Sequence, residues 1–200
     1  MIIYFDTETT GLVPGRIIQL SYILQNEGGT KGKNFYFYVD YVEPAAQAVH
    51  GISIEMLEKL SCGKMFSDYI DEICEDFETA DIIVGHNIGF DIAFMIAEFK
   101  GADRQFRYRE QFDTMKYFTP VMKLPRKSGR GYKYPKLIEI CDYAKIFPYD
   151  VSKKTMEIFG KNGLGAHNAA YDTTMTYLAL EVLKEKDEKL KKCLLSKVNG

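Results

Sequence analysis

The chain has 200 residues, of which 46% are hydrophobic and 27% are charged, so we expect one soluble domain with a full core, residues 1–200. The formal net charge of −2 does not by itself indicate a nucleic-acid partner. The four cysteines form no CxxC pair, which argues against a zinc site or a redox motif. No apolar run approaches the roughly 20 residues that a membrane span requires, and the N-terminus lacks the pattern of a secretory leader, so we expect a reduced, cytoplasmic protein.

The first part of the chain predicts three strands. Ile2 to Phe5 is a short apolar run typical of a buried strand, and Arg16 to Leu24 is rich in Ile, Tyr and Leu. Asn34 to Val39 alternates aromatic residues with others and follows a Gly28-Gly29 turn signal. Because the connections have the length of hairpins, we expect an antiparallel meander.

Helical periodicity begins after these strands. Ser53 and Ser67 are typical first residues of helices, and apolar residues recur at helical spacing after Ser67. Asp81 to Val84 predicts a short buried strand, and Phe90 to Phe99 predicts a helix that ends near Gly101. Helices and strands therefore alternate from this point onward.

The second half continues this alternation. Arg107 to Phe112 predicts a further strand, whereas the prolines and glycines of Thr119 to Tyr134 predict a loop. Pro135 to Ala144 and Ala169 to Lys186 predict helices, and the charged tail, from about residue 184, predicts a solvated helix or a frayed end. A meander followed by alternating elements predicts an α/β fold, a mixed sheet with helices on its faces.

Four carboxylates and a histidine lie at the predicted ends of these elements. Asp6 and Glu8 are two residues apart at the end of the first strand, so their side chains point to the same face. Asp91 falls in the first turn of a helix, and Asp172 falls in the helix that follows His167. Taken singly, each has an ordinary structural interpretation as a solvated strand end, a helix cap or an acid near a helix N-terminus.

Taken together, these residues indicate metal chemistry. Four carboxylates that converge on one crevice repel one another, so such a site needs cations. Oxygen ligands favour hard metals, and we expect two divalent cations, Mg²⁺ or Mn²⁺, suited to phosphodiester hydrolysis. His167, with an ordinary pKa of about 6.5, could accept the proton of the attacking water at neutral pH.

Three segments, in order along the chain, resemble the motifs of the DnaQ-like 3′→5′ exonucleases of the DEDDh group. This group includes the proofreading (epsilon) subunit of bacterial DNA polymerase III and several RNA-trimming enzymes. Val49-His50-Gly51-Ile52 and Phe112-Asp113-Thr114 resemble two further segments of the family. The three motifs are Asp6-Thr7-Glu8-Thr9-Thr10-Gly11-Leu12, His86-Asn87-Ile88-Gly89-Phe90-Asp91 and His167-Asn168-Ala169-Ala170-Tyr171-Asp172.

The resemblance implies a ribonuclease-H-like fold, with a five-stranded mixed sheet flanked by helices. It implies metal-dependent release of nucleoside 5′-monophosphates from a single-stranded or frayed 3′ end of DNA, with a polymerase as a candidate partner. By position, it implies that His167 is the general base and that the metal ligands are Asp6, Glu8, Asp91 and Asp172. It also implies that the substrate-binding residues are Thr9, Thr10, Leu12, His50 and Asn87.

Several roles carried by the resemblance remain open. Phe90 is more consistent with core packing than with substrate contact, and Asp113 with a helix cap than with catalysis. The glycines at 160, 163 and 165 suggest that the loop carrying His167 is mobile before substrate binds. Thr173 departs from the family, which commonly has Ala after this Asp.

The basic segment Lys123–Lys136 (KLPRKSGRGYKYPK) is a second departure from the family. No acid occurs from Lys116 to Lys136, whereas Glu55 to Asp81 is dominated by Glu and Asp. The basic segment can be interpreted as a loop that holds substrate phosphates, with Tyr132 or Tyr134 stacking on bases, or as a solvated surface loop.

The sequence leaves three other functions open. An exoribonuclease of the same family would share every motif, because contacts to the 2′ hydroxyl are not encoded in them. A non-catalytic, polymerase-associated nucleic-acid-binding module would be expected to have lost one of the acids or the histidine, and none is missing. A small-molecule metal phosphohydrolase fits the ordered motifs and the basic segment less well. The motifs give no indication of oligomeric state.

Overall fold

A five-stranded sheet organises the residues that the computed structural model describes, 1–160 and 168–198. Its strands are β1 (Ile2–Thr9), β2 (Ile17–Asn26), β3 (Gly29–Tyr36), β4 (Ile82–Gly85) and β5 (Glu110–Asp113), in the spatial order β3-β2-β1-β4-β5. β1 pairs with β2, and β2 with β3, in antiparallel fashion, whereas β1, β4 and β5 are parallel. The mixed sheet predicted from the sequence is confirmed, and the C-terminal ends of its three parallel strands meet at one edge.

The prediction of the third strand as Asn34–Val39 was wrong in its bounds. The chain turns within two residues between Asn26 and Gly29, which face each other in the ladder, so pairing begins before the aromatic run. Phe37 and Val39 lie beyond the strand and are buried in the core. The early residues of β3 are polar and exposed, which is why alternation did not reveal them.

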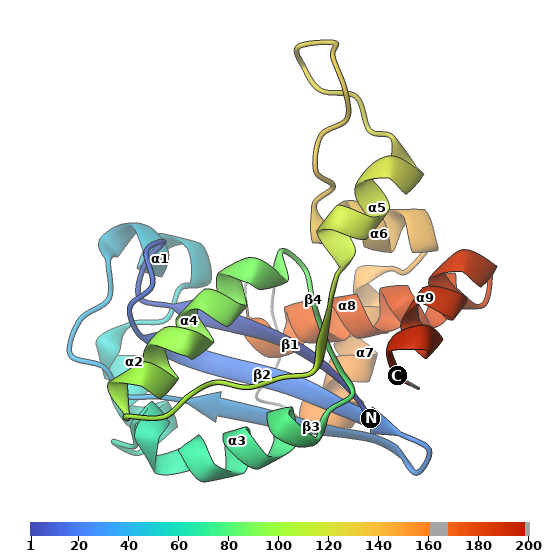
Figure 1. Ribbon diagram of the computed structural model, residues 1–200. Coiled ribbons are helices and arrows are strands. Elements are labelled where there is room, and N and C mark those ends of the chain that lie inside the picture. The colour runs from blue at the N-terminus through green and yellow to red at the C-terminus, as the bar shows by residue number, and fades with distance from the viewer. Residues whose placement is uncertain (161–167, 199–200) are drawn as a thin grey trace.

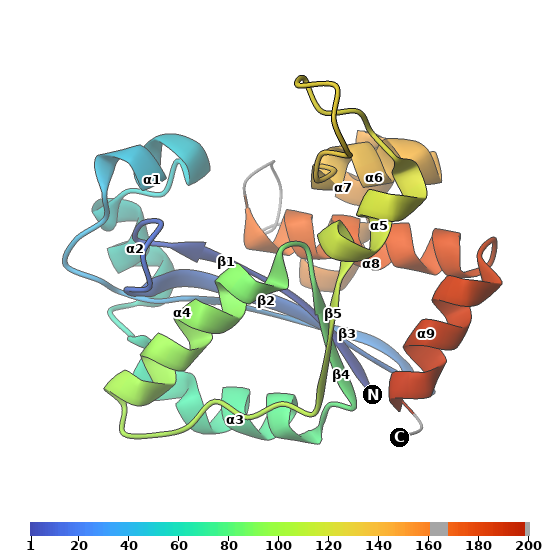
Figure 2. The ribbon, with the colours of Figure 1, turned by 45° about the horizontal axis from the view of Figure 1, so that its top comes forward.

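Helices cover both faces of the sheet (Figure 2). On one face, α3 (Ile70–Thr79) and α4 (Ile88–Gly101) pack on Ile3 and Phe5, whereas α6 (Leu137–Ala144) and α8 (Ala169–Lys184) pack against Tyr4 on the other. Successive strand residues point to opposite faces, so β1 contributes to both cores. β1 is therefore buried from both sides, and this holds its end rigidly.

Several predicted boundaries differ from the structure. A short 3-10 helix, Phe66–Tyr69, precedes α3, so Ser67 lies inside a helical turn instead of opening the helix. Pro135 precedes α6 and its cap Lys136. The charged tail forms a helix, α9 (Glu188–Val198), which was one of the two predictions for it, but the helix is not solvated on every side, because Leu190 and Leu194 are buried against the core.

Two helices, α1 (Pro44–His50) and α7 (Pro148–Phe159), were not predicted from the sequence. A third, α5 (Thr114–Met122), begins after Asp113, the expected helix cap, but its extent was not predicted. α1 buries no residue, so it carries no apolar periodicity, and α5 contains Pro120, which argued for a loop. Residues 119–122 of the expected loop consequently belong to a helix. The helix predicted after Ser53 is confirmed as α2 (Ile54–Ser61), capped by the Ser53 side chain.

The segment Lys123–Lys136 projects from the body of the molecule between α5 and α6 (Figure 1). α1 rises on the same side of the sheet in both views (Figures 1 and 2). Among the described residues, no helix is long and apolar enough to cross a membrane.

Candidate active site

Three carboxylates meet at the end of β1. Oxygen atoms of Asp6, Glu8 and Asp172 all lie within 4.8 Å of one another, and the three side chains are partly exposed. Asp6 and Glu8 share a face of β1 because they are two residues apart. Asp172 comes from the first turn of α8, more than 160 residues later in the chain. Metal ligands predicted from separate motifs are thus brought together.

The pairing of β1 with β2 determines how α8 reaches this cluster. Gln19 lies opposite Glu8 in the ladder. Its amide nitrogen donates to Asn168 Oδ1 at 3.1 Å, and its amide oxygen accepts from Ala169 N at 3.2 Å. Asn168 in turn caps α8 by accepting from Ala170 N. The strand register therefore holds the start of α8 beside Glu8.

Thr173 makes a second connection between α8 and β2. Its hydroxyl donates to the carbonyl of Ser21 at 3.1 Å, and Ser21 lies opposite Asp6 in the ladder. Thr173 is fully buried, so the hydrogen bond is shielded from water. Thr173, where the family commonly has Ala, thus adds a hydrogen bond that helps to hold the neighbouring Asp172 in position.

Asp91 lies beside the cluster but outside the group of three. It is buried in the first turn of α4, where its Oδ1 accepts from the backbone N and the hydroxyl of Thr7 at 3.1 and 2.7 Å. Its negative charge is the largest of the neighbouring charges acting on Asp6. Thr7 thus holds Asp91 near the other acids by a pair of bonds from β1.

Like charges crowd this site. Burial raises the pKa of Asp6 well above its usual range, and the charges of Asp91, Asp172 and Glu8 raise it further. Burial, followed by the charges of Asp172 and Asp91, raises the pKa of Glu8 to about 8. Burial raises the pKa of Asp91 to about 7, although the bonds from Thr7 act in the opposite direction. A bound cation would offset the repulsion among these acids and favour their ionised forms.

A cavity of about 370 Å³ adjoins Glu8. Of the residues expected to bind substrate, Thr9, Leu12 and His50 line it, and Leu12 is 84% exposed. Thr10 does not line it; its hydroxyl instead accepts from Arg16 N at 3.1 Å and braces the turn after β1. Most of the remaining wall is apolar, as is usual for a ligand pocket.

Sequence reasoning missed Glu43, Ala45 and Ala46 as contributors to this cavity, and it gave no role to Val49, which also lines it. The Glu43 carboxylate lies so close to Gly11 that a Cβ there would fall 2.4 Å from its Oε1, so glycine leaves the room that Glu43 occupies. Phe90 packs on the core, as expected, and also lines the cavity, while its contact with substrate stays a prediction. No local pattern marks Glu43, which precedes an unpredicted helix.

His50 lies at the cavity wall. Its Nδ1 accepts from Ile52 N at 3.0 Å, so the ring proton of the neutral form sits on Nε2. Nε2 is buried and makes no well-aligned hydrogen bond with a described residue. Burial lowers the pKa of His50, and the nearby backbone of Thr9 offsets this only in part. Burial therefore favours the neutral form of His50.

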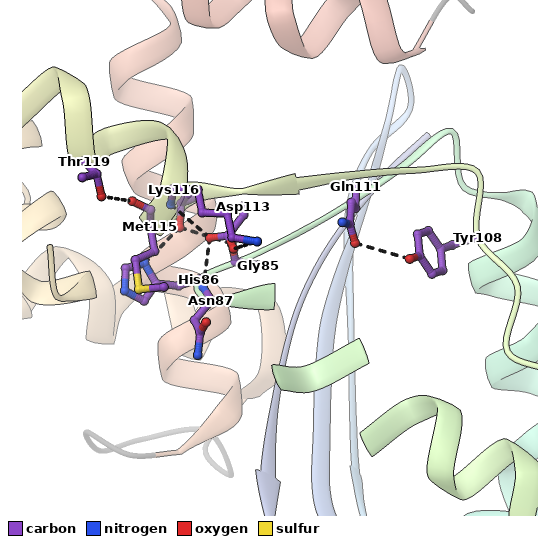
Figure 3. A network of polar contacts seen from close by, with 10 residues as sticks. Gly85, His86, Asn87, Tyr108, Gln111, Asp113, Met115, Lys116 and Thr119 are labelled. Atoms are coloured by element: carbon purple, nitrogen blue, oxygen red, sulfur yellow. Dashed lines mark hydrogen bonds and ion pairs between the residues drawn. The ribbon is translucent and has the colours of Figure 1, made fainter. Parts of the chain in front are cut away.

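A polar network joins the start of α4 to the start of α5 (Figure 3). Asp113 Oδ1 accepts from Asn87 N at 3.2 Å and from Lys116 N at 3.3 Å. Asp113 is thus the N-cap of α5, as its sequence context indicated. Asn87 adopts a left-handed conformation with φ of 62° and an exposed side chain that does not line the cavity. The backbone of Asn87 thus connects α4 to Asp113. The proposed contact of its side chain with substrate is not supported by a place in the cavity wall.

The expected general base, His167, lies outside the described residues, as do Gly163 and Gly165 of the loop that precedes it. Its role and the mobility of this loop therefore stay predictions. The described residue on the near side, Gly160, has φ of 72° and ends α7.

A protein-family model described as an exonuclease, RNase_T, matches residues 3–180. This range contains every site residue considered above. A comparison with curated proteins found no significant match.

Solved structures of E. coli ExoI in complex with single-stranded DNA are similar in fold. The zinc-bound form has a TM-score of 0.65 and 20% sequence identity, and the metal-free form has a TM-score of 0.69 and 17% identity. Each match covers 98% of this chain and 42% of the ExoI chain. The chain thus corresponds to less than half of the ExoI chain, and at this identity the similarity concerns the fold.

Proposed function

The chain belongs to the RNase_T exonuclease family, and on this premise we propose that it hydrolyses nucleic acid from the 3′ end and releases nucleoside 5′-monophosphates. The observation that carries the proposal is the convergence of Asp6, Glu8 and Asp172 within 4.8 Å at the end of β1. The motifs that supply these acids are those expected of a 3′→5′ enzyme of this family.

The donor set fits divalent cations. Every candidate ligand is a carboxylate oxygen, which Mg²⁺ and Mn²⁺ prefer. Burial is the main cause of the raised pKa values of Glu8 and Asp91, and the charges of Asp172 and Asp91 add to it at Glu8. Asp6, Glu8 and Asp172 would hold the ions, with Asp91 completing the set. When bound, two such ions supply Lewis-acid activation and stabilise the charge that develops on the oxygens around phosphorus.

The chain's own residues would orient the terminal nucleotide. Leu12 and Val49 offer apolar surface for its base, and the cavity wall near Thr9 lies next to Glu8, where the scissile phosphate must be. His50 lines the same cavity and would help to shape it around the terminal nucleotide. His167 would accept the proton of the attacking water, as its motif position implies.

Single-stranded DNA is the substrate that we propose first. The structurally similar ExoI chains were solved in complex with single-stranded DNA, which supports this choice. An open cavity beside the carboxylates accommodates one end of a strand, whereas a paired end would first have to fray. Trimming of RNA is the alternative that the test below separates.

The proposal is tested with matched single-stranded DNA, double-stranded DNA and RNA, each labelled at the 5′ end, in Mg²⁺ or Mn²⁺. We expect a ladder that shortens by single nucleotides from the 3′ end, with nucleoside 5′-monophosphate as the product. The Asp6→Asn variant is the matched control for contaminating nucleases. Release of the 5′ label as mononucleotide at early times, or no product from any substrate, would overturn the proposal.

A further inference from the structure

The segment Lys123–Lys136, here called the basic arm, is an ordered hairpin. Pro125 and Tyr132 form a β-bridge, and Lys133 N donates to the Leu124 carbonyl at 2.9 Å. The Arg126 side chain braces the turn, because its Nε donates to the carbonyl of Tyr132 at 2.8 Å. The arm stands away from the body of the molecule (Figure 1). The basic arm is thus a projection whose shape is defined by its own hydrogen bonds.

The arm carries positive charge with almost no internal compensation. It contains no acid, and its cations are Lys123, Arg126, Lys127, Arg130, Lys133 and Lys136. Lys133 forms an ion pair with Glu139 of α6, whereas no carboxylate of a described residue lies within 4 Å of the charged nitrogens of the other five. Like charges on one hairpin repel, and a polyanion would relieve that repulsion.

Both ends of the arm are fixed relative to the acids. α5 leads into it, and the Thr114 hydroxyl at the start of α5 donates to the Gly85 carbonyl at 3.2 Å, at the end of β4. A 3.0 Å hydrogen bond joins the same hydroxyl to His86 Nδ1. The backbone carbonyl of Pro135, at the other end of the arm, also interacts with the His86 ring. His86 therefore connects the segment that leads to Asp91 with Pro135 of the arm and with the start of α5, the helix that leads into the arm.

The position of the arm suits a strand that emerges from the active site. The basic arm and α1, which forms part of the cavity wall, rise on the same side of the molecule (Figures 1 and 2). The acidic helices α2 and α3 lie elsewhere, so negative charge does not surround the arm. Tyr132 and Tyr134 are 43% and 57% exposed beside the cations. Exposed aromatic rings among cations suit the bases and phosphates of a single strand.

We propose that the basic arm binds the phosphates of the nucleic-acid strand on the 5′ side of the nucleotide being removed. This inference rests on the proposed function, because it assumes a strand whose 3′ end lies at the carboxylates. The arm contributes affinity and holds longer strands through successive cleavages, whereas the carboxylates perform the hydrolysis.

The test uses the double variant Lys127→Ser/Arg130→Ser. Both side chains lie near the tip, and neither forms a hydrogen bond or an ion pair with another described residue, so the fold should be unaffected. Gly129 and Gly131, which shape the turn, are retained. The matched control is Lys31→Ser/Lys100→Ser, which removes the same charge from exposed positions on β3 and at the end of α4.

Binding is measured by fluorescence anisotropy of a long, labelled single-stranded DNA in EDTA, with salt varied from about 50 to 200 mM. We expect the arm variant to bind several-fold more weakly than the wild type, with a salt slope smaller by about 1.4, since each single-strand phosphate contact contributes ~0.7. The control variant should bind like the wild type. An unchanged affinity in the arm variant, or an equal loss in the control, would overturn the proposal.

A length series separates this proposal from the proposed function. In Mn²⁺, the arm variant should lose kcat/KM on long strands and retain wild-type values on a dinucleotide. Equal loss at every length would contradict the role of the arm. If the wild type binds long strands through the arm but cleaves none of them, the proposed function fails and the arm's role stands.

Discussion

The carboxylate cluster and the basic arm both concentrate charge of one sign, but in opposite surroundings. At the end of β1, packed helices force Asp6, Glu8 and Asp172 together, and burial raises the pKa values of Asp6 and Glu8. On the arm, the cations are exposed, so water and salt screen their repulsion. The partly buried carboxylates need a specific counter-ion to offset their repulsion. The exposed cations of the arm instead attract any polyanion. Changes in the cluster should therefore be decisive, and changes in the arm should be graded and salt-dependent.

The largest expected effect is that of Asp6→Asn, which should lower activity and raise the stability of the metal-free protein. Asp6→Asn should abolish hydrolysis through loss of metal, yet it removes one of several partly buried charges that repel one another. In EDTA at pH 8 we expect a melting temperature ~2–4 °C above that of the wild type, equivalent to about 1 kcal/mol for a chain of this size. Calorimetry and the ladder assay check both results. A variant that is inactive and also markedly less stable would indicate misfolding instead of loss of a ligand.

His167→Ala should cost roughly 10²–10⁴ in kcat, the usual contribution of a general base. Binding of Mn²⁺ and of DNA should be unchanged, because the histidine is not among the proposed ligands. Single-turnover cleavage at saturating enzyme measures the effect on chemistry alone. Near-wild-type rates would remove His167 from the mechanism while leaving the carboxylate cluster intact.

The metal-free protein should become less stable as the pH rises. Glu8 and Asp91 have folded pKa values of about 8 and about 7, above their ordinary values of 4.5 and 3.8. The folded state therefore holds more protons than the unfolded state, and the stability from these groups is complete below about pH 4 and is lost as the pH passes through 7 to 8. Melting temperatures in EDTA between pH 5 and pH 8.5 test this decline.

Saturating Mn²⁺ should reverse that decline. A ligand that binds only the folded state stabilises it, by about 2.7 kcal/mol at 100 times its dissociation constant. Asp172→Asn is the control, because it removes one proposed ligand. If the melting temperature of the wild type at pH 8 is the same with and without Mn²⁺, a preformed site is contradicted.

The smallest expected effect concerns the tie between α8 and β2. Thr173→Val keeps the volume but loses the bond to the Ser21 carbonyl, which should cost about 1 kcal/mol of unfolding free energy and lower kcat a few-fold as Asp172 loosens. Thr174→Val is the matched control, because its hydroxyl bonds only within α8, to Ala170. Equal losses of kcat in both variants would show that the contact to β2 has no special role.

Local patterns predicted the parts of the fold in which burial and periodicity coincide. β1, β2 and α4 carry apolar residues at the spacing of their elements, so their existence followed from the sequence. α1 buries nothing and could not be predicted in this way. The start of β3 depends on the tight turn at Asn26, not on its own polar residues.

The residues of the candidate site also differ in how far local patterns could predict them. The spacing of Asp6 and Glu8 predicted a shared face, which the structure bears out. The approach of Asp172 depends on the β1–β2 register, through Gln19 and Thr173, and no local pattern encodes that register. Glu43 was missed because only the folded chain brings it against Gly11.

Calorimetric titration of the wild type with Mn²⁺ at pH 7, in two buffers of different ionisation enthalpy, tests the central claim most directly. If the acids at the end of β1 form a divalent-cation site, Mn²⁺ should bind and displace protons from Glu8 and Asp91, so the measured enthalpy should differ between the buffers. Asp172→Asn should weaken this binding strongly. No binding, or binding that survives unchanged in Asp172→Asn, would contradict the account.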